Sequence, residues 1–223
     1  MKRTKYQIIS IALIVLFNSC TAYHPQLVHI PLIRERGDLK IDCGFYIATS
    51  GMNEDGYLEG LPGVNFAISY GITDMLAAQI YMSFVPTPVA SWMHLHGALG
   101  IFRPVGDRTV MELYGGYGFG GSFLDGFYQL AFTQFNLGQT GISRLNLDYG
   151  FGFRVGHIFG TEHLSEQNNG MIIEPSVFLR FGLERIRFSL QFNYLWTRTV
   201  VENLYHPFGI GVGMHVSLNT RRW

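Results

Sequence analysis

The sequence has little charge, little cysteine and no long apolar run, and each shortage excludes a class of protein. Only 14% of the 223 residues are charged, and 16 Lys and Arg balance 16 Asp and Glu. A neutral chain without a basic run lacks the electrostatic footprint of a nucleic-acid-binding protein. Two cysteines are too few for a disulfide scaffold. The one sizeable apolar stretch, residues 8–17, is too short for a membrane-spanning helix, which needs about 20 apolar residues.

The sequence is rich instead in glycine, with 27 residues, and in aromatic residues, which make up 15%. Hydrophobic residues make up 48% of the chain, and this share excludes an intrinsically disordered protein. The length is that of one domain of roughly 200 residues.

The first 19 residues have the features of a secretory signal peptide, because basic residues precede the short apolar stretch. Ser19 directly before Cys20 resembles the lipobox of bacterial lipoproteins, which implies cleavage before Cys20 and lipid attachment to its sulfur. Ordinary cleavage after Ala22 is the alternative. Residues 20–37 contain two prolines and show no period. We interpret them as an extended, lipidated tether in the periplasm.

From residue 38 onward, apolar and polar residues alternate with a period of two, which predicts β-strands. Phe208, Ile210 and Val212, for example, alternate with glycines. Most segments have 10–14 residues, whereas strands of soluble proteins have about 5–6 and strands tilted across a bilayer about 9–11. The predicted strands are 38–49, 62–71, 75–85, 91–102, 109–119, 127–137, 142–156, 171–182, 187–198 and 207–219.

Short and longer connections alternate along the chain. Residues 71–74 and 138–141 are predicted tight turns, whereas 50–61 and 156–170 are among the longer connections. Outer-membrane barrels have short periplasmic turns and longer outside loops. We therefore predict an all-β fold for residues 38–223: an antiparallel up-and-down transmembrane β-barrel of about ten strands, with both termini periplasmic. Eight or twelve strands also fit, and a soluble β-sandwich or lipocalin-like barrel is the alternative fold.

Several short motifs resemble a group of small outer-membrane barrel proteins from Bacteroidota. They are the lipobox Cys20, then Tyr23-His24-Pro25, Ile30-Pro31-Leu32 and residues 35–39, with Gly71-Ile72-Thr73-Asp74 as a typical first periplasmic turn. The resemblance implies an outer-membrane location and a barrel, and it implies no activity and no functional residues. The terminal Trp223 resembles the signal that the barrel-assembly machinery reads, although residues 219–222 interrupt the alternation before it.

The strand registers direct a set of polar residues into the barrel lumen. Unpaired buried charges are costly, so groups of opposite sign are expected to meet there. The pairs then either plug a narrow barrel, which we favour for ten strands, or line a water-filled path. The predicted network comprises Lys40, Asp42, His94, His96, Glu112, Arg144, Asp148, Arg154, Glu174 and Arg180, and further inward residues are Asn65, Gln79, Gln134, Arg187, Gln191, Asn193 and His215.

No pattern of catalytic or metal-binding residues stands out. His94 and His96 share a strand face and would bind a metal only with a third ligand, such as His215 or Glu112, so we interpret them as part of the polar network. No spacing matches the proteases or lipid deacylases that occur on barrels of this size. We therefore expect no cofactor, no metal and no catalysis.

These features together predict a structural or surface-interaction role in the bacterial outer membrane. The expected partners are outer-membrane lipid, lipopolysaccharide, the barrel-assembly machinery and an extracellular ligand at outer loops such as 51–60 and 161–170. A narrow channel for ions or small solutes is the alternative function, and a membrane-embedded hydrolase is the second alternative.

Overall fold

The structure is a computed structural model that describes residues 26–52, 58–86, 91–122, 126–142, 146–160, 169–198 and 208–220. The predicted signal peptide, Cys20, Arg144 and Trp223 lie outside these ranges, as do most of the predicted outer loops.

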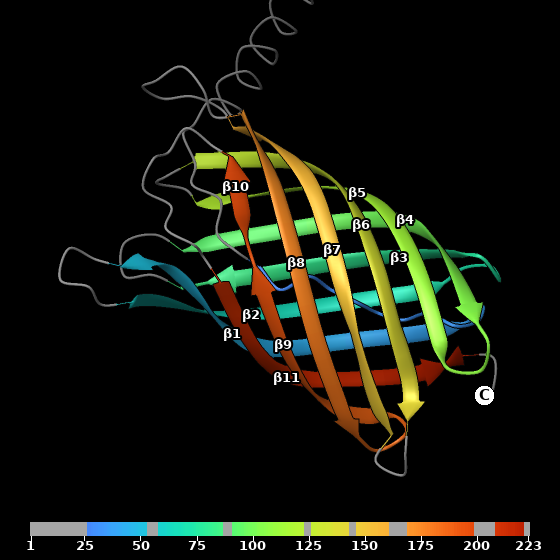
Figure 1. Cartoon of the computed structure of the whole chain (residues 1–223). Helices are drawn as coiled ribbons and strands as arrows, with labels where there is room; N and C mark the ends of the chain where they lie inside the picture. Colours follow the sequence, from blue (N-terminus) through green and yellow to red (C-terminus); the bar gives the residue numbers. More distant parts are fainter. Residues whose placement is uncertain are drawn as a thin grey trace, which may run out of the picture.

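The described residues form one closed antiparallel sheet (Figure 1). From β1 to β9 consecutive strands pair, and β11 pairs with both β9 and β1 to close the ring. β9 and β10 both pair with β8, so together they fill one strand position. This confirms the predicted all-β barrel of ten strands. The strands are β1 (Asp38–Met52), β2 (Leu58–Gly71), β3 (Leu76–Val85), β4 (Trp92–Val105), β5 (Thr109–Ser122), β6 (Gly126–Ile142), β7 (Leu147–Gly160), β8 (Asn169–Gly182), β9 (Ile186–Tyr194), β10 (Trp196–Arg198) and β11 (Phe208–Asn219).

The interruption between β9 and β10 has a local cause in β8. The register pairs Ser176 with Asn193 and Ile173 with Trp196, so the break falls opposite Glu174 and Pro175. Proline has no N–H to donate to a neighbouring strand, and the ladder therefore lapses at this point.

The outer surface of the barrel is apolar and the inner surface is polar. Outward side chains such as Phe45, Leu99 and Phe188 are strongly exposed, whereas inward polar residues such as Glu112 and Arg154 are buried. A closed sheet satisfies its own backbone, and an apolar exterior suits hydrocarbon, so both features fit a barrel that crosses a membrane.

One predicted turn lies elsewhere. Sequence analysis predicts a turn at 138–141, but β6 continues to Ile142 and the connection to β7 follows it. Gly138 lies within the strand and pairs with Val110 and Gly150. A Cβ at Gly138 would come within 2.7 Å of Leu32, so the glycine makes room inside the barrel.

The barrel has two distinct ends. We call "turn end" the end with the connections after β2, β4, β6 and β8, and "loop end" the end with the connections after β1, β3, β5, β7 and β10. β1 begins at the turn end with Asp38, opposite Asn219 near the end of β11.

Residues 26–33, which we call the lumen segment, run inside the barrel from the loop end toward the turn end (Figure 1). Gln26 contacts Tyr128 and Asn193 near the loop end, and Gly37 bonds to Gly71 at the turn end. This corrects the expectation of a tether outside the barrel for the described part of 20–37. It also places Gln26 at the end of the barrel opposite the last strand residue, Asn219, whereas the sequence-based expectation puts both termini on one side.

Candidate functional site: the closed lumen

The lumen segment is held chiefly through its backbone carbonyls. Side-chain amides on β9 donate to it, Asn193 to the Gln26 carbonyl and Gln191 to the Val28 carbonyl, both at 2.7 Å. Gln134 of β6 donates to the carbonyl of His29 at 2.6 Å.

The guanidinium of Arg180, on β8, donates to the Ile30 carbonyl at 2.7 Å. Three barrel strands therefore hydrogen-bond to one extended stretch of main chain. Buried carbonyls need such partners, and here the inward polar side chains supply them.

The two ends of the lumen segment are also fixed. At the loop end, the Gln26 side chain donates to the Tyr128 hydroxyl at 2.9 Å. Toward the turn end, the backbone N–H of Ile33 donates to Glu112 at 2.6 Å, and Asn136 donates to the other oxygen of the same carboxylate at 2.9 Å. The Glu112 carboxylate therefore caps the lumen segment, and among the described residues it forms no ion pair with an arginine.

Apolar side chains of the lumen segment fill the spaces beside glycines of the inner wall. A Cβ on Gly211 would come within 2.2 Å of Leu27 Cδ1, and a Cβ on Gly152 within 2.7 Å of Ile30 Cδ1. A barrel of eight strands is just wide enough for its own side chains, and diameter grows with strand number. Ten strands therefore leave space that an additional segment occupies.

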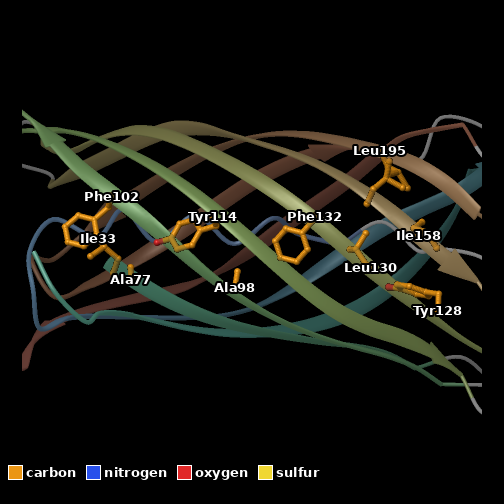
Figure 2. Close-up of a cluster of buried hydrophobic side chains, with 11 residues drawn as sticks. Ile33, Ala77, Ala98, Phe102, Tyr114, Tyr128, Leu130, Phe132, Ile158 and Leu195 are labelled. Atoms are coloured by element: carbon orange, nitrogen blue, oxygen red, sulfur yellow. The ribbon is translucent and has the colours of Figure 1, made fainter. Parts of the chain in front are cut away.

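The buried core of the barrel continues this packing. Figure 2 shows Ile33 beside Phe102 and Ala77 at one end of a cluster that extends through Tyr114 and Phe132. The lumen segment therefore contributes to the hydrophobic core through Ile33.

His29 lies at the centre of a polar cluster. Its Nε2 is 2.6 Å from the Ser69 hydroxyl, and its Nδ1 is 3.0 Å from an oxygen of Asp42. The other Asp42 oxygen is 2.8 Å from His215 Nδ1 and 3.5 Å from Arg180 Nη2. The predicted lumen residue Asp42 therefore joins the lumen segment to β8 and β11.

The order Ser69, His29 and Asp42 is that of a nucleophile, base and orienting acid. All three side chains are buried. The adjoining cavity has a volume of about 20 Å³ and its lining includes His29 and Asp42 but not Ser69. A space of this size holds about one water molecule, so the described geometry gives a substrate no way to the hydroxyl.

Two further ion pairs connect strands inside the barrel. Arg154 of β7 pairs with Glu174 of β8 at 3.2 Å, and both are buried. Arg187 of β9 pairs with Asp148 of β7. Every member of the predicted network except Arg144, which lies outside the described residues, is buried in the barrel.

The two histidines of β4 do not form a metal centre in the described part of the chain. His94 bonds to the Tyr128 hydroxyl, and His96 lies between the rings of Tyr81 and Phe132. Within the described ranges, no group of three or more His, Cys, Asp or Glu residues is arranged to hold a metal ion.

The turn end carries an open polar vestibule with a volume of about 640 Å³. Its lining includes Lys40, which donates to Ser217 at 2.6 Å, and the ion pair of Arg187 with Asp148. Pro31 and Leu32 of the lumen segment also line this vestibule.

Three residues of this site are not among the predicted lumen residues: Gln26, His29 and Ser69. Gln26 and His29 were expected to lie in a tether outside the barrel, and Ser69 is one of many small residues that face inward. The available signal was the match between an apolar stretch, 27–33, and glycines on the inner faces of several strands.

The closed ring of ten antiparallel strands with an apolar exterior defines the class of the protein: a β-barrel resembling the proteins of the bacterial outer membrane. No described helix is long and apolar enough to cross a membrane. No protein-family model and no curated protein sequence matches the chain. Among solved structures, the chain is similar to the outer membrane protease OmpT from Escherichia coli, with a TM-score of 0.44. The two share 10% identity over 86% of this chain and 99% of that one, and this similarity concerns the fold alone.

Proposed function

We propose that the protein is a non-catalytic outer-membrane barrel whose own N-terminal segment closes the lumen, and whose role is structural or lies in contacts at the cell surface. The lumen segment is the observation that carries this proposal. Its carbonyls, its side chains and its two ends are all engaged by the barrel wall. A lumen filled in this way favours function at the ends of the barrel.

The channel alternative depended on the charged lumen. The described charges are engaged in the barrel: Glu112 caps Ile33, Arg154 pairs with Glu174, and Arg180 bonds to Ile30. The hydrolase alternative has one favourable observation, the Ser69–His29–Asp42 arrangement. We propose that this cluster anchors the lumen segment, because the bond to Ser69 and the contact with Asp42 both tie His29 to the wall.

Further parts of the proposal concern residues outside the described ranges. We propose that residues 1–19 are a signal peptide, that Cys20 carries lipid, and that the chain comes from a Bacteroidota species. We also propose contacts of the apolar exterior with lipid and lipopolysaccharide, of Trp223 with the assembly machinery, and of the outer loops with an extracellular ligand.

Conductance in a planar bilayer tests the closed lumen. We expect the purified full-length barrel to give no steady openings. The double variant Gln191→Ala, Asn193→Ala removes two hydrogen bonds to the lumen segment and is expected to open transiently. Gly97→Ala is the matched control, because no atom lies within 4 Å of the added Cβ. Steady, ion-selective openings of the unmodified protein would favour the channel instead.

A further inference from the structure

The lumen segment and the residues that follow it connect the two ends of the barrel. β1 leaves the turn end, and Gly37, just before it, bonds to Gly71 and Thr220 there. Gln26 is at the other end, bonded to Asn193 and Tyr128. Tyr128 pairs with Gly160, the last residue of β7 at the loop end. The chain therefore crosses the barrel once inside the lumen before it builds the wall.

Under the proposed cleavage, the residues before Gln26 are too few to cross the barrel a second time. Only five residues lie between Cys20 and Gln26, and the six extended Cα–Cα steps from one to the other reach about 20 Å. A 14-residue strand such as β7 is about 46 Å long at 3.3 Å per residue, and a bilayer core alone is about 30 Å thick. The cavity beside the lumen segment, about 20 Å³, has no space for a second strand.

We propose that the lumen segment carries the N-terminal end of the mature chain across the membrane and presents it at the loop end, opposite the end of β11. This holds for cleavage before Cys20 or after Ala22, since both sites are within six residues of Gln26. It deepens the proposed function, because it adds the N-terminal end to the loops as part of one surface.

The inference also assigns a leaflet to the lipid. An acyl group on Cys20 would enter the leaflet at the loop end, since Cys20 precedes Gln26 by six positions, a reach of about 20 Å. Longer loops of outer-membrane barrels lie outside the cell. The lipid anchor would then lie in the outer leaflet, and the barrel would serve as the passage through which its own anchor reaches the surface.

Three epitope insertions in the full-length chain test this topology in cells. One tag is placed between Tyr23 and His24, one within 161–168 at the loop end, and one at the exposed Asp107 in the turn after β4. We expect the first two tags to bind antibody on intact cells, and the Asp107 tag to bind it only after the outer membrane is permeabilised. The deciding result is whether the Tyr23 tag behaves like the tag within 161–168 or like the Asp107 tag. This comparison is valid whichever end of the barrel faces outward.

A result in which the Tyr23 tag behaves like the Asp107 tag overturns the inference. A cysteine version, Tyr23→Cys with Cys43→Ser and a membrane-impermeant maleimide, repeats the test without an inserted tag. The proposed function fails separately, by conductance. A conducting barrel whose Tyr23 tag lies on the loop side would keep the inference, and a silent barrel whose Tyr23 tag lies on the turn side would keep only the closed lumen.

Discussion

Gly211→Ala tests the fit between the barrel wall and the lumen segment at a single methyl group. Gly211 lies on the inner face of β11, opposite Tyr46 of β1. The added Cβ would be 2.2 Å from Leu27 Cδ1 and 3.0 Å from Cδ2, far inside van der Waals contact. Overpacking of this kind costs about 1–3 kcal/mol. Since each 1.4 kcal/mol is a factor of ten, we expect the ratio of closed to open barrels to fall about 5- to 150-fold.

Two readouts measure this loss. The free energy of unfolding by urea in lipid vesicles should fall by about 1–3 kcal/mol, and planar-bilayer recordings should show openings that the unmodified protein lacks. Leu27→Ala removes the clashing side chain, so the double variant should be more stable than the sum of the two single effects predicts.

Gly97→Ala controls for the general effect of replacing a strand glycine, because nothing lies within 4 Å of its Cβ. If Gly211→Ala behaves like Gly97→Ala in both assays, Leu27 does not lie against Gly211 and the placement of the lumen segment is refuted.

The remaining predictions concern single interactions of the barrel. Arg154→Ala should lower the free energy of unfolding by about 3–5 kcal/mol, because it removes the guanidinium that pairs with the buried Glu174 carboxylate; an effect below that of a typical surface substitution would contradict the pairing. Ser69→Ala should cost about 1 kcal/mol through the lost bond to His29 and leave any hydrolytic activity unchanged. An activity that disappears in this variant would establish the hydrolase. Replacement of residues 161–168 by a short Asn-Gly turn should leave a heat-modifiable barrel, whereas loss of the barrel would show that this loop is structural.

The barrel wall was predictable because each strand is constrained on two faces. Lipid requires apolar residues outside and the lumen admits polar ones, so period-two alternation is unambiguous along strands such as β11. The same constraint identified inward residues such as Gln134, Arg180 and Gln191. Their partners could not be predicted, since the sequence does not show that these groups bond to a main chain instead of to each other or to water.

The lumen segment was not predictable by periodicity. It is surrounded by the barrel wall on every side. Its apolar and polar side chains therefore all point toward the wall, and no alternation arises. Its carbonyls accept hydrogen bonds from side chains and not from a neighbouring strand, so the segment does not show the sequence pattern of a paired strand. The predicted turn at Gly138 was wrong for a related reason. Glycine is typical of turns, but here it provides space for Leu32 inside the barrel.

The central claim is that residues 26–33 fill the lumen, and thiol protection at Val28 tests it most directly. Val28 is 0% exposed, whereas Asp107 is exposed in a turn. The measurement compares Val28→Cys with Asp107→Cys, both in a Cys20→Ala, Cys43→Ser background, by the rate of reaction with a membrane-impermeant maleimide in the folded barrel. We predict that Asp107→Cys reacts at once and that Val28→Cys reacts only after the barrel is unfolded. Equal rates in the folded protein would contradict the claim.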